Sequence, residues 1–250
     1  MNSKDLLLSR ICLRLVALIM SAAWIGSAIA QNYTFQPARV GGGGFVIEIV
    51  AHPTQNNLLF ARTDVGGAYK WNAGNNSWEQ LINASAMPNA LMTDQQPNGK
   101  EESAQRASIY ECAGIAVART NSNIIYIAGG SNQGNGTDPE NGFLIKSSNG
   151  GNSFTLTSLR VPTKGNGEQR KVERRLAIDP RNANVVFYGT LRSGLRLSTN
   201  GGSSWSLVGG GLPSSTPLVS LNGNREMGHN YVVFDYSSGS ITINGQTRTR

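Results

Sequence analysis

The chain alternates short apolar runs with polar clusters that are rich in Asn, Gly and Ser. Apolar runs such as residues 58–61, 124–128 and 185–189 are only four or five residues long. After residue 30, no long segment has the 3.6-residue apolar spacing of an amphipathic helix. Short β-branched and aromatic runs bounded by turn residues are typical of strands, so the pattern predicts an all-β fold. Residues 89–106 are polar and lack a strand pattern, and we interpret them as a surface loop.

The predicted strands recur in units. A strand, a polar turn closed by Asn and a second strand occupy residues 47–61, 115–128 and 176–189, and residues 232–238 begin the pattern again. The matching turn positions are 52, 118, 179 and 235, so successive units are 66, 61 and 56 residues apart. Several short strands in a unit of this length favour the blades of a β-propeller over the coils of a solenoid.

A second polar turn recurs later in the units. Residues 147–154 (Ser-Ser-Asn-Gly-Gly-Asn-Ser-Phe) and 198–205 (Ser-Thr-Asn-Gly-Gly-Ser-Ser-Trp) follow the Asp-box form S-x-D-x-G-x-x-W of BNR-like repeats, with Asn in place of Asp. Residues 71–78 form a looser copy. In such a turn the Asn side chain bonds the backbone that follows it, Gly takes a left-handed conformation and the aromatic residue fills the core. The boxes therefore predict a structural role, in which the side chains of Trp78 and Trp205 fill the core of a blade.

The units do not complete a ring. The chain holds three units and the opening strand of a fourth, and its last ten residues predict one further strand. Propellers close with at least four blades, and an unclosed one leaves an open edge strand and a half-covered core. We therefore expect an incomplete propeller, either the N-terminal part of a longer protein or a truncated reading frame.

The first thirty residues have the features of an export signal. Three basic residues precede an apolar run over 15–25, which is shorter than a comfortable membrane span, and Ala-Ile-Ala at 28–30 fits an A-x-A cleavage site. We predict a signal peptide over residues 1–30, cleavage near Ala30, and a mature domain over 31–250 that is secreted, outside the cell or in the periplasm, without a membrane anchor. An uncleaved anchor is the alternative.

Charge and metal-binding residues exclude several functions. The formal net charge is +7, but the dense basic segment at 170–175 has glutamates within and beside it and no nucleic-acid fold signature, so we interpret it as a solvated loop. His52 and His229 are the only histidines, which argues against a His-based metal site or a Ser-His-Asp triad. Residues 41–44 (Gly-Gly-Gly-Gly) precede a strand, unlike a phosphate-binding loop. We expect no metal, no cofactor and no nucleic acid. After export Cys112 is the only cysteine, so no intramolecular disulfide forms.

The segment Ala-Arg-Thr-Asp-Val-Gly-Gly-Ala-Tyr-Lys-Trp at 61–71 is the main candidate for chemistry. Two strand-like runs flank an Asp-Val-Gly-Gly turn, in which Gly66 and Gly67 can adopt the positive φ of a tight hairpin. Asp64 is then either a turn residue that caps the Gly66 or Gly67 amide, or a carboxylate with a chemical role. Spacing alone leaves both open.

With this motif, the repeats and the boxes together, the chain resembles the secreted endo-xyloglucanases of glycoside hydrolase family 74. The resemblance is carried by residues 41–46, His-Pro-Thr at 52–54, the 61–71 motif, Leu-Ala-Ile-Asp-Pro at 176–180 and the box around Asn200. It covers essentially the whole mature chain. Where the family usually has Gly-Glu-Arg, this chain has Glu173-Arg174-Arg175, which puts the contribution of that loop in doubt.

The resemblance implies two seven-bladed propellers that clasp the β-1,4-glucan backbone of xyloglucan, of which this chain would supply about three and a half blades. It implies an inverting hydrolase in which Asp64 is the general base. The general acid comes from the second propeller, so the implied partners are that propeller and a polysaccharide substrate, and the 250-residue chain alone is expected to be inactive. Tyr69 and Trp71 are candidates for stacking on sugar rings, although alternating strand aromatics are also typical of a core.

Two other functions compete with this interpretation. A non-catalytic Asp-box propeller that binds carbohydrate or assembles with protein would carry the same boxes. Sialidases also carry them, but they need an Arg-Ile-Pro-like motif near the start of the first blade, and the nearest match, Arg-Val-Pro at 160–162, lies in mid-chain.

Overall fold

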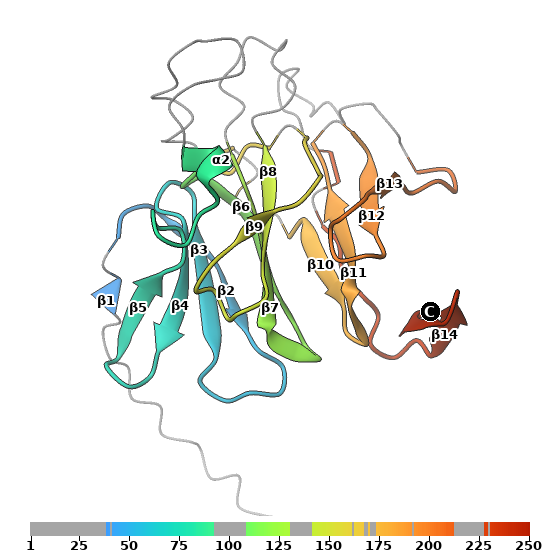
Figure 1. Ribbon diagram of the computed structural model, residues 1–250, viewed down its shortest axis with the longest axis horizontal. Helices are drawn as coiled ribbons and strands as arrows, with labels where there is room; N and C mark the ends of the chain where they lie inside the picture. Colours follow the sequence, from blue (N-terminus) through green and yellow to red (C-terminus); the bar gives the residue numbers. More distant parts are fainter. Residues whose placement is uncertain are drawn as a thin grey trace, which may run out of the picture. The chain divides into compact units, whose positions relative to one another are not determined.

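The computed structural model describes residues 39–40, 42–92, 109–130, 142–161, 163–167, 170, 174–191, 193–212, 228–229 and 231–250. Residues 1–37 and 38–250 form separate units, and the predicted signal peptide lies outside the described residues. Apart from the four-residue helix α2 (Asn89–Met92), every regular element of the described part is a strand, which confirms the all-β prediction (Figure 1). Helix α2 opens the predicted loop at 89–106, and the rest of that loop lies outside the described residues.

The first sheet carries the Asp64 hairpin. Its strands are β1 (Arg39–Val40), β2 (Val46–Ala51), β3 (Leu59–Thr63), β4 (Ala68–Asn72) and β5 (Ser77–Gln80). They lie in the order β1-β5-β4-β3-β2, antiparallel except for the parallel pair of β1 and β5. Phe60 pairs with Lys70 and Arg62 with Ala68, so the predicted hairpin is confirmed.

Two further four-stranded antiparallel sheets repeat the same order. One contains β6 (Cys112–Ala118), β7 (Asn121–Gly129), β8 (Phe143–Ser147) and β9 (Thr155–Leu156), and the other β10 (Leu176–Asp179), β11 (Asn182–Gly189), β12 (Leu195–Ser198) and β13 (Ser206–Leu207). None of the described sheets closes on itself.

The C-terminal segment is a hairpin, not the single strand that we predicted. Strands β14 (Ser240–Ile243) and β15 (Gln246–Thr249) pair antiparallel. The two residues between them, Asn244 and Gly245, have φ values of 53° and 75°. Positive φ at both central residues is the signature of a type I′ turn, for which Asn-Gly is the preferred sequence.

The two glycine-rich polar turns are built alike. The Ser147 hydroxyl accepts the backbone N–H groups two and four residues later, at 3.2 and 2.9 Å, and the Ser198 hydroxyl does the same at 3.3 and 2.8 Å. In each turn the Oδ1 of the asparagine, Asn149 or Asn200, accepts the N–H four residues later, at 3.0 and 2.9 Å. These repeated bonds belong to the scaffold.

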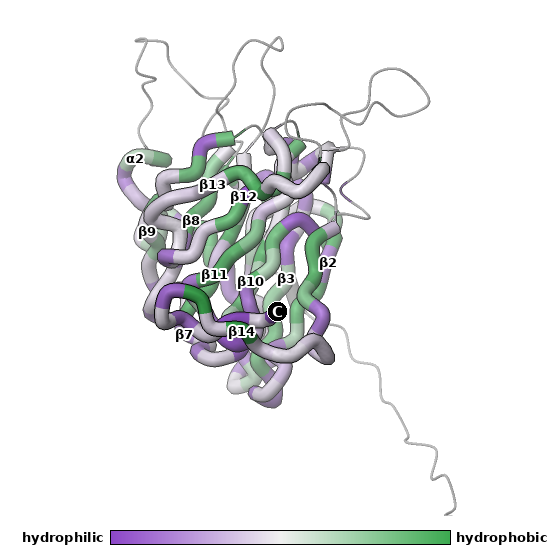
Figure 2. Tube along the Cα trace, turned by 90° about the vertical axis from the view of Figure 1, so that its right-hand side faces the viewer, coloured by the Kyte–Doolittle hydropathy of each residue, from purple (hydrophilic) through white to green (hydrophobic). Residues whose placement is uncertain are grey.

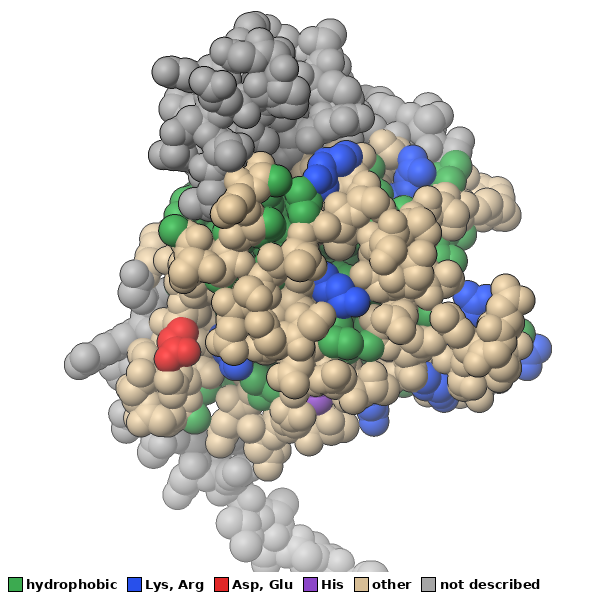
Figure 3. Space-filling model, in the orientation of Figure 1, with side chains coloured by type: hydrophobic (Ala, Val, Ile, Leu, Met, Phe, Trp, Pro, Cys, Tyr) green, Lys and Arg blue, Asp and Glu red, His purple; other side chains and the backbone are tan. Residues whose placement is uncertain are grey.

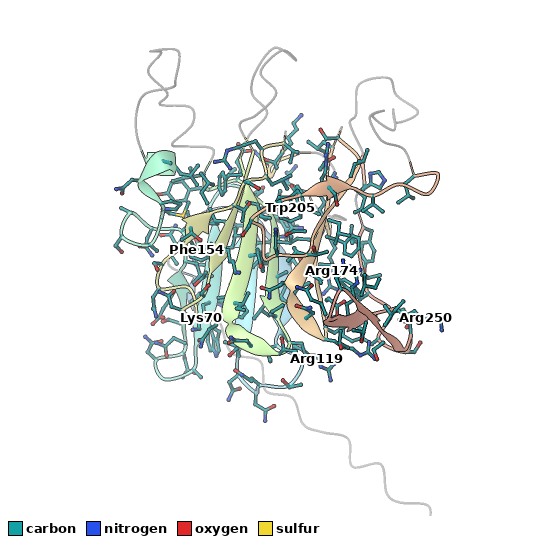
Figure 4. The ribbon with its side chains drawn as sticks, turned by 45° about the vertical axis from the view of Figure 1, so that its right-hand side comes forward. Lys70, Arg119, Phe154, Arg174, Trp205 and Arg250 are labelled. Carbon is teal, nitrogen blue, oxygen red and sulfur yellow. The ribbon has the colours of Figure 1, made fainter. Side chains whose placement is uncertain are left out.

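Apolar side chains fill the spaces between successive sheets. One buried cluster joins the β2–β5 sheet to the β6–β9 sheet and contains Phe154, while a second joins the β6–β9 sheet to the β10–β13 sheet and has Trp205 packed against it. These two aromatics come from the matching turns of successive sheets (Figure 4). Apolar residues follow the strands and polar residues gather in the turns (Figure 2). Each fully buried large apolar side chain contributes roughly 1.5–3 kcal/mol, so this packing is the main source of stability.

The first strands of the three four-stranded repeats and the segment 232–236 line a common cavity. Residues 232–236, where we predicted the opening strand of a fourth unit, do not lie in a strand. Residues from β2, β6 and β10 and from 232–236 surround a volume of about 140 Å³. Large apolar side chains on the two outer members of this set are exposed, with Ile49 at 61% and Val233 at 58%. On the face shown in Figure 3, basic side chains are scattered and several lie over the C-terminal hairpin, without a continuous basic stripe.

Candidate functional site

Thr63, and not Asp64, closes the turn between β3 and β4. The Thr63 hydroxyl accepts the Gly66 N–H at 2.8 Å and donates to the Gly67 carbonyl at 3.1 Å, and the Thr63 N–H donates to the same carbonyl at 2.9 Å. The Gly67 N–H donates to the Tyr110 carbonyl at 2.8 Å. Of the two glycines only Gly67 has a positive φ, 85°. Both amides that Asp64 was a candidate to cap are therefore bonded elsewhere.

The third sheet contains the same turn without a carboxylate. The Thr190 hydroxyl accepts the Ser193 N–H at 2.7 Å and donates to the Gly194 carbonyl at 2.7 Å. The residue after this threonine, at the position of Asp64, is Leu191. The turn therefore needs its threonine, and the carboxylate of Asp64 is an addition to it.

The Asp64 carboxylate is bonded through both oxygens. Its Oδ1 accepts the Phe45 N–H at 2.7 Å, and its Oδ2 accepts Nε of Arg170 at 3.1 Å. The Asp64 N–H in turn donates to the Phe45 carbonyl at 3.2 Å. With 9% of its side chain exposed, the carboxylate sits in a largely desolvated position and keeps a small edge open to solvent.

The glycine run before β2 packs its backbone against this turn. A Cβ at Gly66 would fall 1.7 Å from the Gly43 carbonyl oxygen, and one at Gly42 would fall 1.7 Å from the Tyr69 hydroxyl. A Cβ at Gly44, whose φ is 96°, would lie 3.0 Å from Asp64 Oδ1. Only glycine allows this close approach. Sequence reasoning assigned this run no role, although its position in the family motif was a signal.

The structure describes three arginines of the basic segment at 170–175, which we predicted to be a solvated loop, and each of them contacts a distant part of the chain. Arg170 bonds Asp64, and Nε of Arg174 lies 3.5 Å from Glu48 Oε1. Arg175 is buried and donates to the His229 carbonyl at 3.0 Å. The side chain of Arg174 is half exposed, as a solvated loop predicts. The prediction was wrong for Arg170 and Arg175, because a run of charges carries no information about the acceptors that the fold brings from distant segments.

A second buried arginine, Arg62, connects the hairpin to strands β2 and β6. Arg62, which is fully buried, donates through Nε to Glu48 Oε2 at 2.9 Å and through a terminal nitrogen to the Cys112 carbonyl at 3.0 Å.

Burial raises the pKa of the Cys112 thiol to about 12, so this cysteine is a core residue without nucleophilic character.

The two candidate stacking aromatics differ in exposure. Tyr69 is 1% exposed and donates its hydroxyl to the Gly66 carbonyl at 2.7 Å, so its ring presents no face to a ligand here. Burial, with a contribution from Tyr110, raises the pKa of Tyr69. Trp71 is half-buried and meets Trp78 edge to face, with ring centroids 5.4 Å apart.

The described part of the chain contains neither a cluster of metal-binding side chains nor a membrane-spanning helix. Nowhere in it do three or more His, Cys, Asp or Glu side chains lie where they could hold a metal ion, and it has no helix long and apolar enough to cross a bilayer. His52 accepts the Thr54 N–H on Nδ1 at 3.3 Å, and its Nε2 lies 3.2 Å from the Ala118 carbonyl, so this side chain links two sheets.

Known proteins match the chain over most of its length. No protein-family model matches. An oligoxyloglucan-reducing end-specific xyloglucanase of Emericella nidulans is 30% identical over 241 residues, which are 95% of this chain and 26% of that protein. Xyloglucanases of Paenibacillus and Hypocrea jecorina are 29% and 31% identical, over 88% and 94% of this chain and 20% and 26% of their own lengths.

Solved structures of GH74 enzymes also superpose on this chain. The GH74 xyloglucanase of Xanthomonas campestris superposes with a TM-score of 0.64 at 28% identity, over 83% of this chain and 27% of that one. The GH74 enzyme of Niastella koreensis gives 0.55 at 32% identity, over 72% of this chain and 23% of that one. The chain thus spans only about a quarter of the length of the relatives that it matches. Over that length, the chain is similar in sequence to these xyloglucanases and in fold to these GH74 structures.

Proposed function

We propose that this chain supplies the general-base half of the active site of an exported xyloglucan hydrolase. The observation that carries the proposal is the state of Asp64: its turn is closed by Thr63, and its carboxylate is instead bonded to the Phe45 N–H and to Arg170. The matching turn in the third sheet forms with Leu191 at that position. A carboxylate that its own turn does not need is available for chemistry.

The reaction proposed is inverting hydrolysis of the β-1,4-glucan backbone. A water oxygen forms a bond to the anomeric carbon as the glycosidic C–O bond breaks; Asp64 takes a proton from that water, and an acid gives its proton to the leaving oxygen. Inverting glycosidases hold these two carboxyl groups roughly 6.5–9.5 Å apart to admit the water. In this proposal the acid belongs to a second propeller of the full-length protein, with Asp64 as its counterpart.

The proposed architecture is an incomplete propeller with Asp-box turns, about three and a half blades of seven, over residues 31–250. The matched bonds of the Ser147 and Ser198 turns support it. The proposed export signal over 1–30, cleaved near Ala30, agrees with an extracellular polysaccharide as substrate. Of the two candidate sugar-stacking aromatics, we retain Trp71 as a sugar contact. We omit Tyr69, because the ring of Tyr69 is buried.

The test is hydrolysis of xyloglucan by the full-length protein and its Asp64→Asn and Asp64→Leu variants, followed as reducing sugar. General-base catalysis contributes typically about 10²–10⁴-fold, so both variants should lose activity on that scale. Asp64→Leu removes the carboxylate from a turn that should still form, because the matching turn in the third sheet closes through Thr190 with Leu191 at this position. The 31–250 chain alone should release no reducing sugar. Wild-type activity in either variant, or clear activity of the 31–250 chain, contradicts the proposal.

A non-catalytic binding or assembly module is the second candidate. It is favoured by one observation: both Asp64 oxygens already have partners, so the carboxylate can serve as a clamp between the Phe45 and Arg170 loops. The two candidates differ in the same assay. A clamp predicts that Asp64→Asn lowers thermal stability while the full-length protein has no hydrolytic activity to lose.

A further inference from the structure

The loop before β10 brings an arginine to Asp64 from 106 residues further along the chain. Nε of Arg170 donates to Asp64 Oδ2 at 3.1 Å, with 27% of the arginine side chain and 9% of the aspartate side chain exposed. A charge-assisted bond of this kind is stronger than a neutral one and is weakened little by solvent when it is largely buried.

This loop is anchored on the second sheet before it reaches the first. The Thr163 hydroxyl donates to the Gly129 carbonyl at 2.7 Å, and the Gly165 N–H donates to the Gly130 carbonyl at 3.3 Å. A Cβ at Gly165 would lie 2.4 Å from the carbonyl carbon of Glu111, so the two backbones are in contact. The position of Arg170 is therefore set by the packing of the second sheet.

The guanidinium group is itself held at two points. While Nε faces Asp64, a terminal nitrogen donates to the Gly167 carbonyl at 3.1 Å, and the Arg170 N–H donates to that same carbonyl at 3.1 Å. The planar guanidinium thus presents a donor of fixed direction to the carboxylate.

We infer that Arg170 is a positioning residue that sets the direction in which Asp64 faces the attacking water, an inference that rests on the proposed function. An ionised carboxylate has about four lone-pair sites. The Phe45 N–H occupies one lone-pair site on Oδ1, and Arg170 occupies one on Oδ2. Because each oxygen is held by one bond, the orientation of the carboxylate plane is fixed, and so are the directions of the remaining lone pairs. Without Arg170 the carboxylate is held on one side only and can rotate.

The test uses the full-length protein with Arg170→Met, Arg170→Lys and the matched control Arg181→Met, assayed for kcat and KM on xyloglucan. Since a misplacement of about 1 Å can cost on the order of 10²-fold in rate, Arg170→Met should lower kcat by about 30- to 100-fold and leave KM within about twofold. Arg170→Lys should keep more of kcat than the methionine variant, and low guanidinium concentrations should partly restore Arg170→Met. Arg181 bonds Thr249 and Ser238 beyond the other end of β10, so its variant should match the wild type.

Three results would overturn the inference. The first is a wild-type kcat in Arg170→Met, and the second is a raised KM with unchanged kcat, which would make Arg170 a substrate contact. The third is an equal loss of kcat in both Arg170 variants, with lowered thermal stability and no rescue by guanidinium. The Asp64 variants separate this failure from that of the proposed function. If Asp64→Asn is inactive and Arg170→Met is normal, only the role of Arg170 falls; if Asp64→Asn is fully active, both fall.

Discussion

At the scale of single residues, neighbours in the chain have separate tasks. Thr63 closes the β3–β4 turn and Asp64 makes bonds that leave the turn. The family motif identified Asp64 as the residue of interest, and its place on a hairpin was predictable from the flanking strands and glycines. That the threonine does the capping was not predictable, because a hydroxyl and a carboxylate are both good acceptors for a turn amide.

Replacing Thr63 tests this division. Thr63→Val removes the hydroxyl that bonds Gly66 and Gly67, and leaving those groups unsatisfied should cost about 1–3 kcal/mol of unfolding free energy. Thr63→Ser keeps the hydroxyl and should cost less. Urea unfolding of the full-length protein measures both, with Thr190→Val expected to behave like Thr63→Val; equal stability of the valine and serine variants at position 63 would contradict the assignment.

At the scale of elements, the matching strands β4, β8 and β12 each carry a basic residue that pairs with an aromatic residue of the preceding strand. Lys70 pairs with Phe60, Lys146 with Tyr126 and Arg196 with Tyr188. Nζ of Lys70 donates to the Gly150 carbonyl in the turn of the next sheet, and Nζ of Lys146 lies over the Tyr126 ring. Burial lowers the pKa of Lys146. The strand repeat was readable from the sequence, but the bond between sheets from Lys70 to Gly150 was not, since it depends on how the sheets stack.

The contrast between two of these cations gives a stability prediction. Lys70→Met removes a bond between sheets and should cost about 0.5–1.5 kcal/mol, the usual net value of a hydrogen bond. Arg196→Met is the matched control, because within the described residues the buried Nε of Arg196 has no hydrogen-bond partner. In the 31–250 chain, denaturant unfolding should show a loss for the first and none for the second. A loss in both variants would show that Arg196 is also engaged.

At the scale of the whole molecule, the same periodicity that builds the sheets leaves apolar side chains exposed. Ile49 on β2 and Val233 and Tyr236 near the C-terminus are each more than half exposed beside the strands that line the cavity. Exposed apolar surface of this kind marks a contact or an aggregation site. The alternation of residues predicted which positions face a sheet surface, whereas only the packed structure shows which surfaces stay uncovered.

Self-association of the 31–250 chain should follow from this surface. Its sedimentation coefficient should rise with concentration, and Ile49→Thr should weaken the dependence because it removes apolar area from the exposed face. Leu207→Thr, on β13 and away from the cavity, is the control and should change it less. A monodisperse monomer at all concentrations would contradict the prediction.

Most of the strands, their repeat in units, the glycine-rich polar turns and the hairpin that carries Asp64 were predictable from the sequence. These follow from apolar alternation and from turn residues, which act over a few positions in the chain. Three features became visible only in the folded chain: Arg170 bonds Asp64, the glycine run packs against the turn, and Tyr69 is buried. Those contacts join segments far apart in sequence, and their geometry is set by the packing of one sheet on the next.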